Sequence, residues 1–265
     1  MDKVFNSNMT NPANLTDNKI NIGLFSGYSN FSNSFSYRDV ISNVGGSNVL
    51  DLDNVLNGMT GGSNLISDNA VQSLSFAFAV KDWNFSFHHN VRNNNQVTLP
   101  KELLEFAWRG NAQFIGEEIN IAPQFNMQAY NEIGFGIARK FNKLTVGARF
   151  KKLNGIANFH TESEMLMINT AETTYDMTIQ SDFMINGSAA VDFGGFENLD
   201  FDTDGFKVGD ILKANKGFGF DIGASYQLNS KLQLSFSMLD IGSINWTDNT
   251  YNYHSEGQYL YTGFD

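Results

Sequence analysis

Three aspartates at alternate positions are the most specific candidate for chemistry in the sequence. Asp200, Asp202 and Asp204 precede Gly205 and match the start of a calcium loop, in which alternate carboxylates converge on the ion and glycine permits a sharp turn. The full EF-hand pattern also needs a glutamate at loop position twelve, where this chain has Ile211. Calcium binding and a solvated acidic loop both stay open, and the acidic loop is the preferred interpretation.

Other catalytic or metal-binding patterns are weak. His88 and His89 are adjacent on a predicted strand, so they point to opposite faces and cannot share a metal ion. His160 and His254 have no histidine or cysteine at ligand spacing. No G-x-S-x-G motif occurs, and residues 134–136 lie in a strand pattern rather than in a phosphate-binding loop. We therefore expect no enzymatic activity and, calcium aside, no cofactor.

Four charged residues fall on the polar face of predicted strands. They are Glu132, Arg149, Lys151 and Asp221. In a barrel these side chains would face the lumen, where they would pair or line a channel. Pairing that only stabilises the interior is the preferred interpretation.

Strands must position these residues, because the recurring signal is the alternation of apolar with small or polar side chains. In residues 144–151, for example, leucine, valine, alanine and phenylalanine alternate with threonine, glycine, arginine and lysine. This period of two predicts about ten strands in an all-β antiparallel fold. The expected strands are 19–37, 71–81, 83–98, 116–129, 132–140, 143–168, 170–187, 217–228, 231–245 and 254–264.

The connections between strands differ in length. Short polar turns are predicted at Tyr130-Asn131, Phe141-Asn142 and Asn229-Ser230. Longer segments are predicted at 40–70, 100–110 and 189–215, with short helices at 51–57 and 100–110. Short turns at one end and long loops at the other are typical of outer-membrane barrels.

Composition excludes several classes of protein. The absence of cysteine excludes disulfide scaffolds and thiolate metal sites. The net charge of −11 argues against nucleic-acid partners and against docking on an anionic membrane surface. No apolar run reaches the roughly 18 residues of a transmembrane helix, and no signal peptide is visible. Charged residues form 17% of the chain, compared with about 25% in a typical soluble domain.

The two faces of the predicted strands suggest the surroundings of the sheet. One face is rich in phenylalanine, leucine, isoleucine and valine, and the other mainly carries glycine, serine, alanine, asparagine and glutamine. Small polar residues suit a crowded or water-filled lumen, and the apolar face then suits lipid. A soluble β-sandwich or lipocalin-like barrel with a phenylalanine-rich core is the alternative.

Several stretches carry a resemblance to known barrels. Thr10-Asn11-Pro12-Ala13-Asn14-Leu15 resembles the start of the outer-membrane long-chain fatty-acid transporter family. Residues 217–226 with 232–246, and 130–136 with 144–155, resemble an uncharacterised Bacteroidota outer-membrane β-barrel family that is distantly similar to those transporters. The resemblance covers most of the chain. It implies an antiparallel transmembrane β-barrel in the cell outer membrane.

The resemblance also implies a domain organisation. We expect one β-barrel domain over residues 1–265, with 1–18 as an N-terminal plug or rim segment. Asn11, Pro12 and Ala13 would belong to the plug, or else only anchor the terminus at the rim. The chain has fewer strands than the transporters, and Phe264 is penultimate where outer-membrane barrels usually end on an aromatic residue. A C-terminally truncated piece is therefore expected.

Three functions remain open. The leading one is a transporter or channel for hydrophobic small molecules, with membrane lipid around it. The second is a non-enzymatic structural or assembly barrel that partners envelope or secretion proteins. The third is a soluble β-rich binding protein.

Overall fold

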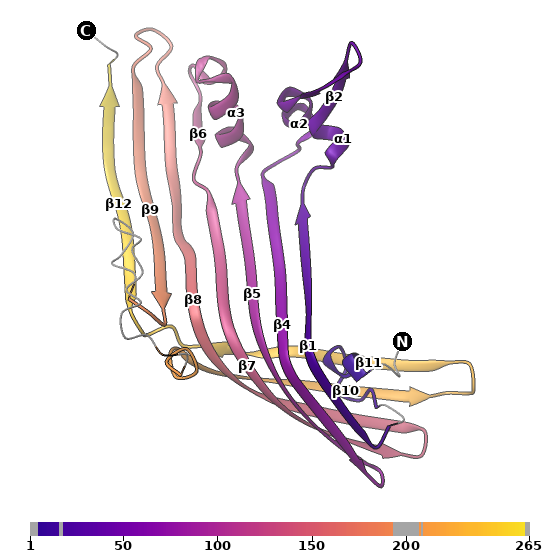
Figure 1. Cartoon of the computed structure of the whole chain (residues 1–265). Helices are drawn as coiled ribbons and strands as arrows, with labels where there is room; N and C mark the ends of the chain where they lie inside the picture. The colour runs from indigo at the N-terminus through magenta and orange to yellow at the C-terminus, as the bar shows by residue number, and fades with distance from the viewer. Residues whose placement is uncertain (1–4, 16–17, 193–206, 208, 263–265) are drawn as a thin grey trace.

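The computed structural model describes residues 5–15, 18–192, 207 and 209–262, and one large antiparallel sheet dominates this part of the chain (Figure 1). Ten of the described strands pair in that sheet, and two short ones, β2 (Ile41–Val44) and β3 (Ser47–Leu50), form a separate hairpin. The strands of the large sheet are β1 (Ile20–Asn33), β4 (Ser63–Val80), β5 (Trp83–Leu99), β6 (Glu118–Asn120), β7 (Gln124–Phe141), β8 (Leu144–Thr170), β9 (Met177–Ala189), β10 (Lys216–Gln227), β11 (Gln233–Ile244) and β12 (Thr250–Tyr261).

Some of the ten strands lie end to end along the same edge of a neighbouring strand. β9 and β10 pair with the same edge of β8, β10 with residues 144–154 and β9 with residues 157–170. β11 pairs with β10, and β12 pairs with β9. β6 likewise continues β7 along the other edge of β8. The described sheet is therefore a meander of seven long rows, in which a row is either one strand or two strands placed end to end. The connection between β9 and β10 interrupts one row in its middle and is not a loop at the end of a row.

The sheet bends where β9 gives way to β10. Figure 1 shows β9 and β12 in an upper arm and β10 and β11 in a lower arm, with β1, β4, β5, β7 and β8 running through both. The lower arm curls, so that its two edge strands, β1 and β11, line one cavity of about 440 Å³. No pairing joins β1 to β11 among the described residues. The all-β antiparallel prediction is confirmed, but the sheet is not closed, so the predicted barrel is not shown.

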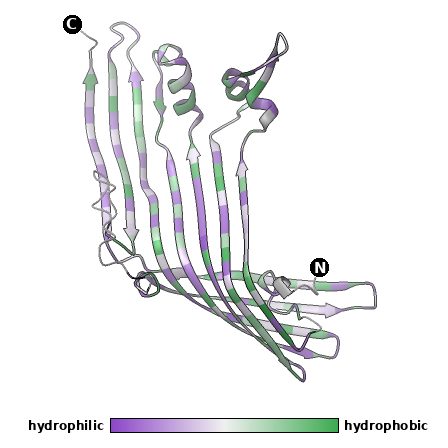
Figure 2. Cartoon of the chain, in the orientation of Figure 1, coloured by the Kyte–Doolittle hydropathy of each residue, from purple (hydrophilic) through white to green (hydrophobic). Residues whose placement is uncertain are grey.

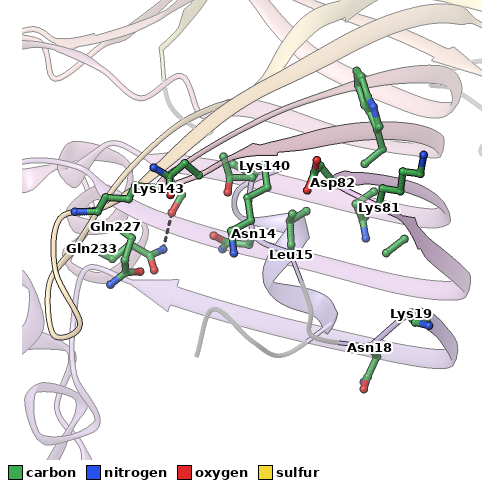
Figure 3. A pocket seen from close by; sticks show the side chains of 17 residues that line it. Asn14, Leu15, Asn18, Lys19, Lys81, Asp82, Lys140, Lys143, Gln227 and Gln233 are labelled. Carbon is green, nitrogen blue, oxygen red and sulfur yellow. Dashed lines mark hydrogen bonds between the residues drawn. The ribbon is translucent and has the colours of Figure 1, made fainter.

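Short turns gather at the end of the lower arm. β4 and β5 are joined by Lys81-Asp82, and β7 and β8 by Asn142-Lys143, two-residue loops whose first residues have φ of 54° and 52° (Figure 3). The predicted turn at Tyr130-Asn131 is wrong, because both residues lie within β7. The β7–β8 register shifts at Ala129/Tyr130, and this bulge breaks the alternation as a turn would.

Helical segments lie in the upper connections and at the N-terminus. The two predicted helices are present as α2 (Leu52–Gly58) and α3 (Lys101–Arg109). Asp51 caps α2 by accepting a hydrogen bond from the Asn54 N–H at 2.9 Å. None of the described helices is long and apolar enough to cross a membrane. The remaining segments are η1 (Phe5–Met9), α1 (Tyr37–Val40) and η2 (Ala112–Phe114).

The lower arm has an unusual distribution of side chains. We define its inner face as the one that bears Arg149 and Asp221 and its outer face as the opposite one. The charged pair is 3% and 0% exposed, whereas Phe135, Phe218 and Phe236 on the outer face are 56%, 60% and 58% exposed. Figure 2 shows that the strands that run through both arms are greener, and therefore more hydrophobic, in the lower arm than in the upper one. Apolar residues thus face outward and charges face inward, which is the reverse of a water-soluble domain.

Candidate functional site: a buried charge network beneath an N-terminal plug

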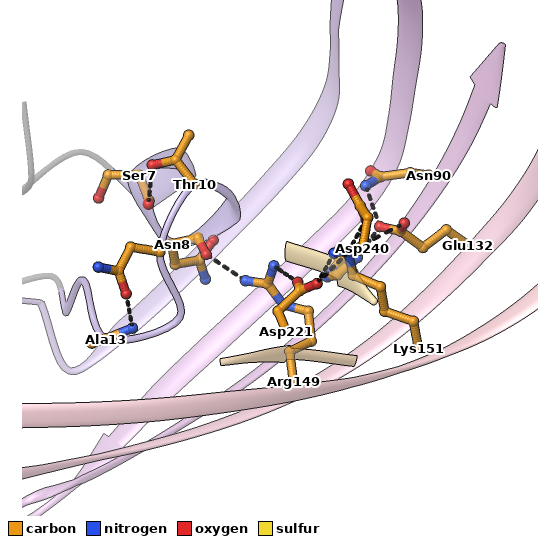
Figure 4. Close-up of polar contacts among 12 residues, drawn as sticks. Ser7, Asn8, Thr10, Ala13, Asn90, Glu132, Arg149, Lys151, Asp221 and Asp240 are labelled. Carbon is orange, nitrogen blue, oxygen red and sulfur yellow. Dashed lines mark hydrogen bonds and ion pairs between the residues drawn. The ribbon is translucent and has the colours of Figure 1, made fainter. Parts of the chain in front are cut away.

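The four predicted polar-face residues come together on the inner face (Figure 4). Arg149 Nη1 lies 3.0 Å from Asp221 Oδ2, and Lys151 Nζ lies 2.8 Å from Asp221 Oδ1. Lys151 Nζ is also 3.6 Å from Glu132 Oε2. They come from β7, β8 and β10, three adjacent strands whose alternation places all four on one face.

Four further residues complete this cluster, which we call the charge network. His88 Nε2 lies 2.8 Å from Glu132 Oε1, to which the Asn90 amide also donates at 3.2 Å. Arg92 Nη1 lies 3.1 Å from Asp240 Oδ2, and Lys151 contacts Asp240 at 2.5 Å. Sequence reasoning missed these residues. The signal was present in β5, where His88, Asn90 and Arg92 stand at alternate positions and therefore share a face.

The charge network is electrically balanced. Three cations, Arg92, Arg149 and Lys151, contact three carboxylates. Removing so many charges from water costs several kcal/mol per ion, on the order of what good pairing can return. Removing one partner would leave a buried charge uncompensated, so each member depends on the others.

A bulge in β11 positions Asp240. The β10–β11 register shifts here, so Leu239 and Asp240 oppose the single residue Asp221. Asp240 adopts φ of 57°, and its backbone N–H donates to Asp221 Oδ1 at 2.8 Å. Asp221 therefore receives hydrogen bonds from three groups, the Arg149 guanidinium, the Lys151 ammonium and this N–H. A left-handed backbone conformation is strained at a non-glycine residue, and the contacts of Asp240 with the charge network stabilise it here.

The N-terminal segment covers this network on the inner face. We call residues 7–15, which include the end of η1, the plug. The Asn11 amide nitrogen donates to Ser235 Oγ at 2.7 Å, to the Phe236 carbonyl at 3.1 Å and to the Ala224 carbonyl at 3.3 Å. Its Oδ1 accepts from the Ala13 N–H at 2.8 Å. Asn11, Pro12 and Ala13, the residues expected at a plug or rim, are all buried against β8, β10 and β11.

One contact joins the plug to the network. Arg149 Nη2 donates to the Asn8 carbonyl at 2.5 Å, while Nη1 of the same guanidinium pairs with Asp221. The plug therefore provides an acceptor for a buried cation, and the cation in turn holds the plug. Loss of either should loosen the other.

Glycines make room for these contacts. A Cβ at Gly223 would lie 2.0 Å from Asn11 Oδ1, and one at Gly147 would lie 2.4 Å from the Pro12 carbonyl oxygen. A Cβ at Gly134 would lie 2.0 Å from the His88 ring. Glycine inside a strand commonly marks such a close approach. Glycine at these positions of the predicted strands is therefore the sequence signal that indicates a close neighbour, here the plug and His88.

The other candidate residues take different places. Asp200, Asp202 and Asp204 lie outside the described residues. Within the described part, no group of three His, Cys, Asp or Glu side chains could hold a metal ion. The histidines are separate: His89 lies 2.7 Å from Ser73 Oγ, and His254 lies 3.0 Å from Asp182.

Comparison with known proteins identifies a family. A profile described as a family of unknown function, DUF5723, matches residues 12–265. No curated protein matches the chain. No solved structure matches it either.

Proposed function

Because the chain belongs to the DUF5723 family, whose function is unknown, we propose a function from its geometry. The protein is a non-enzymatic outer-membrane protein of the β-barrel class. Its lower arm lies in the bilayer, with the outer face against lipid and the plug on the inner face. The observation that carries this proposal is the inverted distribution of the lower arm, where phenylalanines are exposed and ion pairs are buried.

A soluble β-sandwich would need a second layer over the apolar face. No described element covers it, since the plug and the charge network occupy the opposite face. Exposing so many large apolar side chains to water would be costly, at about 25 cal/mol for each Å². Lipid removes that cost.

The dimensions of the apolar face fit a bilayer. On β8 the outward residues run from Leu144 to Phe150, and on β4 they run from Leu74 to Val80. Seven residues at about 3.3 Å each span about 23 Å, close to the ~25 Å apolar band of outer-membrane barrels. Trp83 lies beside the β4–β5 turn and stacks with Arg139, whose guanidinium is 4.8 Å from the indole. Aromatic and basic residues at this level suit a membrane interface.

Fractionation tests the membrane assignment. The protein expressed with an export signal should sediment with membranes, resist extraction by alkaline carbonate and dissolve in detergent. Migration in gels should change on heating if the folded sheet resists the detergent dodecyl sulfate. A native protein that stays in solution without detergent would overturn the proposal.

A second candidate is the uptake of hydrophobic small molecules, and an apolar cavity favours it. This cavity of about 260 Å³ lies between α2, α3 and the upper ends of β4 and β5. Its lining is almost wholly apolar and includes Val55, Leu65, Leu104 and Trp108. Fatty acid should quench the part of the tryptophan fluorescence that is lost in Trp108→Phe, and Val55→Phe should weaken the quenching by narrowing the cavity. If fatty acid does not bind saturably, the uptake function is rejected and a structural or assembly role is favoured.

A further inference from the structure

A second cavity lies at the short-turn end of the inner face, away from the charge network. It has a volume of about 520 Å³ and lies between the plug residues Ala13–Leu15 and the ends of six strands, β4, β5, β7, β8, β10 and β11 (Figure 3). We call it the basic cavity. Its size falls within the range of small-molecule sites.

Lysines dominate its charge. Lys19, Lys81, Lys140 and Lys143 line the basic cavity, and Asp82 is the one acidic residue of its lining. None of these four lysines forms an ion pair within the described part of the chain. Such a concentration of positive charge is notable in a chain of net charge −11. In a concave site it attracts anions.

A buried amide provides an independent sign of a ligand. Asn84 lines the same cavity and is only 9% exposed. Its side chain makes no hydrogen bond with another described residue. Buried polar groups are nearly always satisfied, so the amide of Asn84, which has no protein partner and opens to the cavity, is placed to hydrogen-bond with a polar occupant there.

The backbone at Lys81 points the same way. Lys81 stands at φ of 54° in the first position of its hairpin loop. Glycine, asparagine and aspartate are the residues that suit this conformation, and Asn142 holds the equivalent position in the β7–β8 turn. A lysine here costs local strain, which is explained if its ammonium has a role.

We propose that the basic cavity binds a phosphate-bearing ligand. Lysine is a compact point charge that suits phosphate, and several lysines around one space match a group with more than one negative charge. The amide of Asn84 adds a hydrogen-bonding group beside the lysines. The phosphate can belong to an anionic lipid headgroup at the membrane surface or to a soluble phosphorylated compound. The proposal does not depend on the membrane assignment.

Calorimetry with pyrophosphate, on the full chain in an uncharged detergent, tests the soluble source. We expect saturable one-to-one binding that weakens at high salt. Lys140→Gln combined with Lys143→Gln should weaken it at least about tenfold. The matched control is Lys231→Gln, at the β10–β11 turn but outside the cavity lining, which should change affinity by less than about twofold.

Nanodiscs test the lipid source. The protein would be reconstituted in neutral lipid with trace spin-labelled phosphatidylglycerol, and lipid immobilisation would be measured for the same variants. If the parent protein does not bind pyrophosphate, and the spin-labelled lipid is immobilised by the parent and by Lys231→Gln but not by the double variant, the site binds a lipid headgroup. The absence of both kinds of binding, or equal losses in the double variant and in Lys231→Gln, would overturn the proposal. Urea unfolding of each variant checks that the fold is retained.

Discussion

Arg92 on β5 and Asp240 on β11 form an ion pair, with Nη1 and Oδ2 3.1 Å apart, although three strands separate β5 from β11 in the sheet. Four strand spacings of about 4.8 Å would hold these strands about 19 Å apart in a flat sheet. Both side chains reach inward across the intervening strands. The pair therefore depends on the curl of the lower arm and ties its inner face together.

Removing the cation from the most buried pair should be severe. Arg149→Met leaves Asp221, which is 0% exposed, with one fewer partner and frees the Asn8 carbonyl. We expect a loss of about 3–5 kcal/mol in the free energy of unfolding, measured by urea titration in detergent. Arg92→Met should cost less, about 1–2 kcal/mol, because Asp240 is half exposed. Equal losses for the two variants would show that burial does not govern the network.

The plug should be sensitive to one added methyl group. Gly223→Ala places a Cβ against Asn11 Oδ1, and we expect a loss of about 1–3 kcal/mol and faster deuterium exchange in residues 7–14. Gly219→Ala is the control on the same face of β10, since its Cβ meets no atom closer than 3.6 Å. Its exchange should match the parent protein. Unchanged exchange in Gly223→Ala would contradict the plug contacts.

Asn11 should hold the plug through its amide. Asn11→Ala removes three hydrogen bonds to β10 and β11, at about 1 kcal/mol each. The expected loss is about 2–3 kcal/mol, with increased cleavage of the N-terminal segment by proteases. Asn14→Ala removes one bond, to the Ser7 carbonyl within the plug, and should have a smaller effect. A larger effect from Asn14→Ala would count against Asn11 as the anchor.

The upper connection should loosen in acid. The Ser42 hydroxyl and then the Asn54 N–H hold the pKa of Asp51 below its usual value. Its stabilising contribution is therefore present above the unfolded pKa and disappears as the pH falls through the folded pKa. Relative to the intrinsic exchange rate at each pH, deuterium exchange in α2 should accelerate below about pH 4 in the parent protein. In Asp51→Asn that acceleration should be reduced, and identical profiles would contradict the cap.

The local sequence pattern predicted the strands well, but it predicted the turns and loops between them less well. The alternation in β8 and β10 located both strands and put Arg149 and Asp221 on one face, because side-chain direction follows from a period of two. Tyr130-Asn131 was mistaken for a turn, because a bulge and a turn interrupt alternation alike. The sequence predicts a long loop at 189–215 and does not predict that it interrupts a row of the sheet, since only strand pairing reveals that β9 and β10 share one edge of β8.

The network was harder to predict because its partners are distant in sequence. Asp240 lies 148 positions from Arg92, and its inward direction depends on the β11 bulge. No local pattern specifies such a bulge or the curl that brings β11 toward β5. Sequence predicted the polar face, and tertiary structure determined which charges meet on it.

Whether the outer face lies against lipid is tested most directly by comparing two neighbouring residues of β8, Thr145 on the inner face and Val146 on the outer face. The chain has no cysteine, so single spin labels can be placed by Thr145→Cys and Val146→Cys in protein reconstituted into bilayers. If the outer face lies against lipid, the label at position 146 should collide with oxygen and be shielded from a water-soluble nickel complex. The label at position 145, beside the basic cavity, should show the reverse. Equal exposure of both labels to the nickel complex would contradict a lipid-facing outer surface.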